Sequence, residues 1–326
     1  MVPQQLQAGE NLTLWSGFIL LGFSDVPELQ TTTFNIFLPL YVCTVLANLT
    51  MVLLISADPQ LHTPMYFFLS HLAFIDFCLS TAISPKALET FLLGRSHISF
   101  LACFAQMYVY LALIVSECFL LGVMACDRYV AVCKPLLYAT TMSRASCWSL
   151  MVLVYTTGFL SSLLHIVLAG RLSFCQARNI NHFFCELPTL LLLSCSDTGV
   201  NETFLVAHAA FNILSSFLVI LLSYTYILHT ILQIPLAKGK LKAFSTCTSH
   251  LIVVTTFYAP GVVVYVQPGQ ACWRDQAKLV AACYTILTPT LNPLIYSLMN
   301  KEVRKALRRV WVRKLVPQLP RIWKGI

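Results

Sequence analysis

The sequence predicts an all-α membrane protein, a bundle of seven transmembrane helices followed by a short amphipathic helix. Three observations predict it: 58% of the 326 residues are hydrophobic, only 10% are charged, and the charged residues leave long apolar windows between them. A soluble domain carries about 25% charged residues, so one globular core cannot hide this much apolar surface. The composition therefore excludes a soluble enzyme and a disordered chain.

Seven windows are long and apolar enough to cross a bilayer, which takes a helix of about 20 residues. Five have no charged residue, and the other two hold one acid each, Asp76 and Glu117. None shows the period-two alternation of a barrel strand. The predicted spans are 33–56, 64–84, 100–126, 147–168, 203–228, 246–266 and 278–298. The apolar run Trp15–Phe23 is too short for an eighth span, and no basic residue precedes it as in a secretory signal peptide.

The basic residues indicate the orientation. Fifteen of the 21 Lys and Arg residues follow spans three, five and seven, six follow spans two, four and six, and none precedes span one. Positive charge marks the cytoplasmic side, so we expect a plasma-membrane protein with an extracellular N-terminus and a cytoplasmic C-terminus. The net charge of +8 then reflects topology and attraction of the tail to anionic membrane lipid, not binding to nucleic acid.

The chain is expected to form one folded domain with two short flanking parts. Residues 1–32 form an extracellular segment, residues 33–299 the transmembrane domain, and residues 300–326 a cytoplasmic helix and tail. In this last part, apolar residues recur at helical spacing among basic ones, at Val303, Leu307, Val310 and Trp311. That pattern predicts an amphipathic helix on the inner leaflet.

Asp76 and Glu117 are the only acids at membrane depth. A buried carboxylate there is costly and is by default functional, facing the bundle interior with a partner. The alternative is a protonated carboxyl that only makes a structural hydrogen bond. Asn48 and Asn292 lie at comparable depth and are candidates to join the acids. A shared cation, Na⁺, is a candidate occupant of this cluster, and the sequence predicts no other metal and no organic cofactor.

Two short motifs lie at the predicted cytoplasmic ends of spans three and seven. The end of span three carries Asp127, Arg128 and Tyr129. An acid next to a base at the membrane surface is by itself an ion pair that contributes little to stability. In span seven, Pro293 removes a backbone hydrogen bond and kinks the helix, and Asn292 is placed to satisfy a freed group. A kinked helix beside an ionic pair is typical of a two-state switch.

Five of the thirteen cysteines fall on the predicted extracellular side, which is oxidising: Cys103, Cys175, Cys185, Cys195 and Cys272. The four in span three and the loop after span four permit three pairings, which spacing does not distinguish. Cys272 is left over.

Three Asn-x-Thr sequons occur in the chain. Asn11 lies on the external segment and is the predicted glycosylation site. Asn201 abuts span five, where access for glycosylation is restricted, and Asn48 lies inside span one as a chance match.

Taken together, five runs make the sequence similar to rhodopsin-like G-protein-coupled receptors, and more closely to olfactory receptors. The runs are Leu61–Ser70, Met124–Val132, Lys242–Cys247, Pro289–Ser297 and Asn300–Val303. The resemblance implies a receptor rather than an enzyme, which binds small, hydrophobic, mostly uncharged odorants and activates a stimulatory heterotrimeric G protein to raise cyclic AMP. It also implies trafficking chaperones as partners.

The resemblance assigns roles to residues at both ends of the bundle. By the family pattern, Cys103 pairs with Cys185 and Cys175 with Cys195. The switch residues would be Asp127, Arg128, Tyr129, Tyr224, Asn292, Pro293 and Tyr296. Arg128 is expected to pair with Asp127 at rest and to face the G protein in the active state. The chain departs from the family pattern at Ala47, Cys126, Lys134, Ala259 and Met299, which concerns coupling and surface expression rather than the class.

By the same analogy, the ligand lies in the outer half of the bundle. The candidate ligand-binding residues are Tyr110, Leu111, Ile114, Val115, His208, Asn212, Tyr258, Val262 and Tyr265. Any single Leu, Ile or Val here is more simply a packing residue, whereas a polar pair such as His208 and Asn212 would be costly facing lipid. Amine receptors carry an Asp where Tyr110 stands, and opsins carry a Lys within span seven, whereas residues 279–300 contain no Lys here. An amine ligand and bound retinal are therefore not expected.

Three other classes can place acids or histidines in a membrane. A secondary transporter usually shows repeated halves with helices broken at matching positions, and neither is visible. An intramembrane aspartyl protease would need motifs around Asp76 and Glu117 that are missing. A metalloprotease would need a His-Glu-x-x-His run, and none of the eight His residues provides one.

Overall fold

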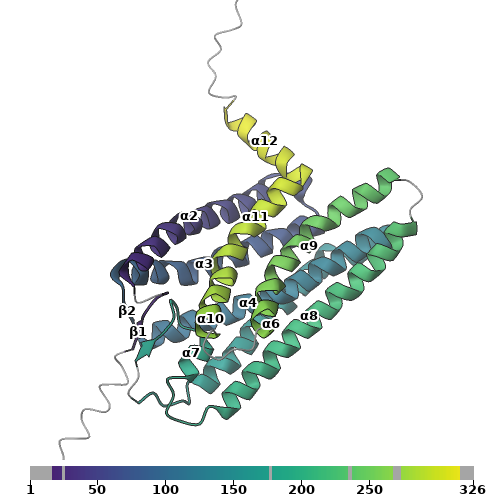
Figure 1. The fold of residues 1–326 in the computed structure, drawn as a ribbon. Helices are drawn as coiled ribbons and strands as arrows, with labels where there is room; N and C mark the ends of the chain where they lie inside the picture. Colours follow the sequence, from purple (N-terminus) through teal and green to yellow (C-terminus); the bar gives the residue numbers. More distant parts are fainter. Residues whose placement is uncertain (1–16, 24–25, 176–177, 234–236, 267–272, 316–326) are drawn as a thin grey trace, which may run out of the picture.

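The computed structural model describes residues 17–23, 26–175, 178–233, 237–266 and 273–315, and these form a long helical bundle (Figure 1). Six of the described helical segments are long and apolar enough to cross a membrane. They are α2 (Pro27–Ala57), α3 (Pro64–Leu93), α4 (Phe100–Cys133), α6 (Arg144–Ala169), α8 (Gly199–Gln233) and Lys278–Met299. A further 30-residue helix, α9 (Ala237–Val266), contains the predicted sixth span and packs on the last segment.

Several helices extend beyond the predicted spans. Helix α2 begins at Pro27, six residues before the predicted start of span one at residue 33. Helix α3 continues to Leu93, nine residues past its predicted end, and α9 begins at Ala237, nine residues early. The physical reason is that charge-free windows report the thickness of the hydrocarbon, whereas a helix can continue into water. Proline favours the first turn of a helix, and it stands there in both α2 and α3.

The last span is interrupted, although the sequence predicts one continuous helix. It consists of α10 (Trp273–Ala282), a π-helical turn η3 (Cys283–Leu287) and α11 (Thr288–Met299). Pro289 is the second residue after the π turn. Its ring would clash with the carbonyl group of Thr285 in a regular helix, and a wider turn relieves such a clash.

A three-stranded sheet lies at one end of the bundle, which we call the sheet end. Strand β1 (Phe18–Leu20) pairs antiparallel with β2 (Ser96–Ile98) and parallel with β3 (Asn179–Ile180), giving the order β2-β1-β3. The sequence analysis predicts only that the run Trp15–Phe23 is too short for a transmembrane span. In the structure, this run supplies the central strand of the sheet. The remaining short elements are η1 (Pro59–Leu61), η2 (Pro135–Leu137), α5 (Tyr138–Thr141) and α7 (Leu187–Leu191).

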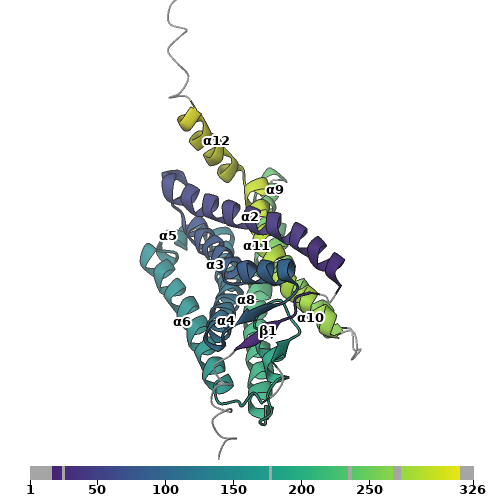
Figure 2. The same ribbon diagram turned by 90° about the vertical axis from the view of Figure 1, so that its left-hand side faces the viewer.

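The opposite end of the bundle carries α12 (Lys301–Leu315), as both views show (Figures 1 and 2). We call it the α12 end. Val303 and Ala306 are fully buried against the bundle and Leu307 packs on its core, so the predicted amphipathic helix is confirmed. The side chains of Val310 and Trp311 are not among those that the structure describes. Arg309 donates two hydrogen bonds, of 2.6 and 3.0 Å, to Oδ2 of Asp58 in the turn after α2.

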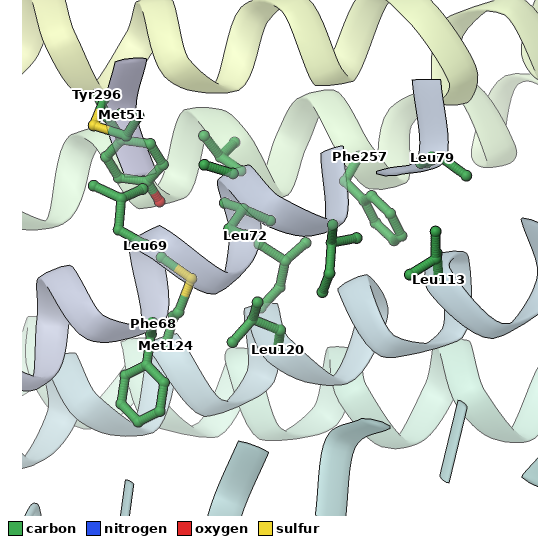
Figure 3. Close-up of a cluster of buried hydrophobic side chains, with 14 of the residues drawn as sticks. Met51, Phe68, Leu69, Leu72, Leu79, Leu113, Leu120, Met124, Phe257 and Tyr296 are labelled. Carbon is green, nitrogen blue, oxygen red and sulfur yellow. The ribbon is translucent and has the colours of Figure 1, made fainter. Parts of the chain in front are cut away.

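The core runs lengthwise between α3 and α4. Figure 3 shows part of it, with Leu72 and Leu120 between Tyr296 and Phe257 and with Leu79 and Leu113 on the other side of Phe257. Helices α4 and α6 approach closely because residue 158 is glycine: a Cβ there would lie 2.4 Å from the carbonyl oxygen of Ala112. Large apolar side chains cover the outside of the bundle, such as Leu214, which is 66% exposed. A soluble monomer does not show such a surface, whereas a bilayer covers it.

Candidate functional site

A cluster of buried acceptor oxygens lies at mid-length in the bundle. Asp76 on α3 and Glu117 on α4 are fully buried, and Nδ2 of Asn292 on α11 donates a 3.0 Å hydrogen bond to Oδ2 of Asp76. Among the described residues, Oδ1 of Asp76, both carboxyl oxygens of Glu117 and Oδ1 of Asn292 have no hydrogen-bond partner. Unsatisfied buried oxygens are costly. Carboxylate and amide oxygens are also the ligands that hard cations prefer.

This cluster contains two acids and one amide. In the described part of the chain, no group of three or more His, Cys, Asp or Glu side chains is placed to hold a metal ion. The carboxyl and amide oxygens of this cluster are ligands of the kind that suits a hard cation rather than a soft transition metal.

Asn48 does not join the acids by a hydrogen bond. Its Nδ2 donates to the carbonyl oxygens of Thr44 and Pro289, both at 2.9 Å. The carbonyl of Pro289 is the group that loses its helical partner because Pro293 has no N–H. Asn48 on α2 thus satisfies the group freed at the kink, a role that the sequence analysis gave to Asn292.

Arg128 is buried near the α12 end of α4, with 5% of its surface exposed. The expected pair with Asp127 is wrong for this structure: no ion pair or hydrogen bond joins Arg128 to another described residue, and Oδ1 of Asp127 accepts a 2.8 Å hydrogen bond from Tyr138 on α5. Adjacent residues on a helix do not face each other, which separates the two side chains. The guanidinium lies within electrostatic range of Asp127, and also of Tyr224 and Tyr296.

His250 on α9 joins three helices next to Arg128 and was missed by the sequence analysis. Its Nε2 lies 3.2 Å from the carbonyl oxygen of Leu121, and its Nδ1 lies 2.8 Å from the hydroxyl of Tyr224. A carbonyl can only accept, so Nε2 carries the proton and Nδ1 accepts from Tyr224. The available signal was a histidine inside a predicted span, three residues after the Lys242–Cys247 run.

The candidate ligand-binding residues divide into two groups. In the first, the hydroxyl of Tyr258 on α9 lies 2.6 Å from Oγ of Ser216 on α8, and Sγ of Cys118 on α4 lies 3.0 Å from the same oxygen. Tyr110 packs edge-on against Phe184, with ring centroids 5.0 Å apart. On α4, three further candidates are partly buried: Leu111, Ile114 and Val115. The side chains of Val262 and Tyr265 are not among those that the structure describes.

The second group lies between α8 and α6. A ring nitrogen of His208 lies 3.1 Å from Nε2 of His165, and Nδ2 of Asn212 lies 3.0 Å from the other ring nitrogen of His208. Oδ1 of Asn212 is buried without a partner among the described residues. The structure therefore brings the two predicted polar residues together, but against His165, which the sequence analysis did not single out.

The sheet end is closed by a covalently linked loop. The predicted disulfides Cys103–Cys185 and Cys175–Cys195 are both confirmed. Asn11 and Cys272 lie outside the described residues. Asn201 is 6% exposed inside the first turn of α8, which disfavours its glycosylation.

Within this loop, His182 and Glu186 face each other, with Nε2 and Oε2 3.4 Å apart. Burial raises the pKa of the Glu186 carboxyl to about 7. Burial, and then the charge of Lys278, lowers the pKa of His182 to about 3, so the imidazole is neutral at physiological pH. Lys278 donates to Oδ1 of Asn181 at 2.7 Å and to the carbonyl of Phe23 at 3.2 Å.

The architecture matches that of a solved heptahelical receptor. Squid rhodopsin superposes with a TM-score of 0.69 over 88% of this chain and 87% of the rhodopsin chain, at 16% sequence identity. At that identity the likeness concerns the fold alone.

Sequence comparison shows the family. The sequence profile of the olfactory receptor family matches residues 37–314. Human olfactory receptor 8I2 is 50% identical over 95% of this chain and 100% of its own length, and human olfactory receptor 5AU1 is 47% identical over 94% and 84%. Mouse olfactory receptor 8U9 is 46% identical over 93% and 97%. The chain is a multi-pass G-protein-coupled receptor, not an enzyme, and it belongs to the olfactory receptor family.

Proposed function

We propose that this receptor binds small, hydrophobic, mostly uncharged odorants near the sheet end and activates a stimulatory heterotrimeric G protein at the α12 end, raising cyclic AMP. The ligand would contact α4, α8 and α9, where the described polar groups of Cys118, Ser216 and Tyr258 are hydroxyls and a thiol. Such groups suit an apolar ligand with one polar handle. Trafficking chaperones would assist its passage to the surface.

The observation that carries the coupling proposal is the state of Arg128. It is buried, makes no ion pair with Asp127, and lies within electrostatic range of Tyr224 and Tyr296 on two other helices. A receptor must present different structures to its G protein with and without ligand. A buried arginine held by no single partner is suited to change partners when α8, α9 and α11 move.

The experiment is an odorant-panel screen in cells that supply the olfactory stimulatory G protein and a trafficking chaperone. We expect a dose-dependent cyclic AMP rise for some odorants. Tyr265→Phe, His208→Ala and Asn212→Ala should each shift the potency of such agonists, because a lost hydrogen bond to an uncharged ligand costs about 0.5–1.5 kcal/mol. Surface expression of each variant is the control, and unchanged dose–response curves for all three variants would move the ligand elsewhere.

We also propose an extracellular N-terminus and a cytoplasmic C-terminus in the plasma membrane. Two features support this orientation: the 15-to-6 division of basic residues, and two disulfides on the side that carries fewer of them. Glycosylation of Asn11 would follow. Asn11→Gln should then shift the glycosylated band on a gel, and an unshifted band would remove Asn11 as the acceptor.

A third proposal is that Asp76, Glu117 and Asn292 together bind Na⁺. Four acceptor oxygens of this cluster have no partner among the described residues, and a cation there would offset the cost of burying two carboxylates. The thermal midpoint of the purified receptor should rise when Na⁺ replaces choline at constant ionic strength. Asp76→Asn and Glu117→Gln should each abolish that rise, whereas Glu89→Gln, at an exposed acid, should keep it.

A further inference from the structure

A cavity of about 540 Å³ lies at the α12 end of the bundle, apart from Arg128 and from the candidate ligand region. Its walls come from the end of α2, the start of α3 and the start of α6, with η1 and the residue after α5 beside them. Figure 2 shows α5 and the start of α6 beside α3 at this end of the bundle. The apolar part of the wall includes Leu61, Phe67, Met142 and Trp148.

One wall of the cavity is fixed by aromatic packing between α3 and α6. The rings of Phe67 and Trp148 meet edge to face with centroids 5.0 Å apart, and His71 packs on Trp148 at 5.7 Å. His71 is in turn held by a 3.1 Å hydrogen bond between its Nδ1 and the hydroxyl of Tyr155. Trp148 is nevertheless 52% exposed, so its ring is both part of a packed wall and open to the surroundings.

The rest of the lining is polar and positively charged. The cavity is lined by Arg144, His62 and the hydroxyls of Ser56, Thr63 and Ser70, and none of the lining residues that the structure describes is an Asp or Glu. The one acid of the turn after α2, Asp58, is bound by Arg309. Arg144 is exposed and makes no ion pair with any residue that the structure describes. A negatively charged group can therefore approach this guanidinium without displacing an internal partner.

The depth of the cavity indicates the kind of ligand. It lies where three spans end, and an exposed tryptophan is typical of the membrane–water interface. On the orientation proposed above, this interface belongs to the cytoplasmic leaflet, which contains anionic phospholipids. An apolar wall below a cationic rim matches the two halves of such a lipid.

We propose that this cavity binds an anionic phospholipid, with the phosphate at Arg144 and His62 and one acyl chain along Phe67 and Trp148. The site is separate from the basic surface of α12, whose attraction to lipid needs no cavity. A lipid bound here would contact α2, α3 and α6 together and so hold the turn after α2 against the start of α6.

Trp148 is the probe for the test. In full-length receptor with Trp15, Trp273, Trp311 and Trp323 replaced by phenylalanine, Trp148 is the one remaining tryptophan. The receptor is placed in two series of nanodiscs, in which the mole fraction of acyl-brominated phosphatidylserine or of acyl-brominated phosphatidylcholine is varied over the same range. We expect phosphatidylserine to quench Trp148 at a mole fraction about five-fold lower, the contribution of one basic side chain near an anionic surface.

The variants distinguish a built site from general attraction. Arg144→Gln should remove the preference and Arg144→Lys should keep most of it, whereas Arg308→Gln, which deletes an equal charge on exposed α12, should leave it unchanged. Native mass spectrometry of the receptor with all its tryptophans gives a second measurement. There we expect phosphatidylserine adducts that Arg144→Gln depletes and Arg308→Gln does not.

Three results would overturn the proposal: equal quenching by both lipids, a preference that persists in Arg144→Gln, or stronger quenching by a brominated sterol that Arg144→Gln does not alter. The last result would make the cavity a sterol site. Both leaflets of the nanodisc have the same composition, so the outcome does not depend on the proposed orientation. A preference that requires Arg144 in a receptor without any odorant response would refute the proposed function and retain the lipid site.

Discussion

The two ends of the bundle are held together by different kinds of interaction. At the sheet end, two disulfides and the strand order β2-β1-β3 join segments that are far apart in the sequence. At the α12 end, neighbouring elements are joined mainly by single side-chain hydrogen bonds, such as Asp127 with Tyr138 and Tyr224 with His250. A covalent cross-link contributes about 2–5 kcal/mol in a small domain, and one hydrogen bond about 0.5–1.5 kcal/mol.

This difference indicates which end can change shape at low cost. Separating α8 and α9 near Arg128 would break the hydrogen bond between Tyr224 and His250. It would break neither of the two disulfides nor the strand pairing that the structure describes at the sheet end. Separating the segments at the sheet end would require breaking a disulfide or three strand segments at once. We therefore expect the sheet end to keep its shape between receptor states, and the α12 end to differ between them.

The largest expected effect comes from removing the disulfide that links α4 to the following loop. The Cys103→Ala, Cys185→Ala double variant should lose most of its surface expression, measured by flow cytometry of an N-terminal tag. The Cys175→Ala, Cys195→Ala variant should lose less. Its disulfide spans 20 residues in sequence, whereas Cys103–Cys185 spans 82, and the shorter loop contributes about 1 kcal/mol less through chain entropy. Equal loss from both pairs would contradict this ranking.

Arg128→Ala tests the other end of the comparison. The receptor should reach the surface and bind odorant, yet give no cyclic AMP response, because the buried charge within electrostatic range of Tyr224 and Tyr296 is gone. Lys305→Ala, which removes an exposed charge on α12, is the control and should respond normally. A full response per surface receptor in Arg128→Ala would refute the switch role.

Gly17 and Gly22 give a matched test of the sheet. Both have a positive φ, 79° and 80°, so alanine strains the backbone about equally at each. A Cβ at Gly17 would lie 2.2 Å from the carbonyl oxygen of Ile98, whereas at Gly22 its nearest atom is a side-chain carbon of Thr90 at 3.4 Å. Gly17→Ala should therefore lower the thermal midpoint clearly more than Gly22→Ala. A similar loss in both variants would mean that β1 contributes little to the sheet end.

The sequence predicted the parts of this structure that hydropathy and residue type determine. The number and order of the spans, the two disulfides and the burial of Asp76 with Glu117 and Asn292 all followed from composition, spacing or the family resemblance. Helix ends did not, because apolar windows report the hydrocarbon and not the length of a helix. Strand β1 was missed because its three residues pair with partners distant in the sequence, which no local pattern reveals.

The side-chain partners at the site were the least predictable feature. Asp127 and Arg128 are neighbours in sequence, but Asp127 accepts a hydrogen bond from Tyr138, and no ion pair within the described residues joins it to Arg128. His208 and Asn212 were expected to face a ligand, and their contact with His165 depends on how α6 packs against α8. Such choices depend on the relative rotation of helices, which a single sequence does not specify.

The smallest expected effect is a pH dependence confined to the sheet end. The pKa of Glu186, raised by burial to about 7, exceeds its usual value of about 4.3. A carboxyl whose pKa is higher in the folded loop stabilises the loop below its unfolded pKa, and this contribution is lost as the pH rises through about 7. His182 has a lowered pKa of about 3, so its own contribution changes only below its unfolded value of about 6.5. From about pH 6.5 up to about pH 7, where the His182 contribution no longer changes, Glu186 is therefore the group whose protonation alters the stability of the loop.

Hydrogen exchange of the loop after α6 measures this effect. After correction for the intrinsic pH dependence of exchange, protection of the amides from 179 to 191 should fall as the pH rises through about 7. Amides near Tyr224, at the other end of the bundle, should show no such change. Glu186→Gln should remove the pH dependence, because an amide does not titrate, and Glu89→Gln, at an exposed acid of α3, should leave it intact. If Glu186→Gln keeps the pH dependence, or if protection changes equally at both ends, the titrating group lies elsewhere and the sheet end is no more pH-sensitive than the rest of the bundle.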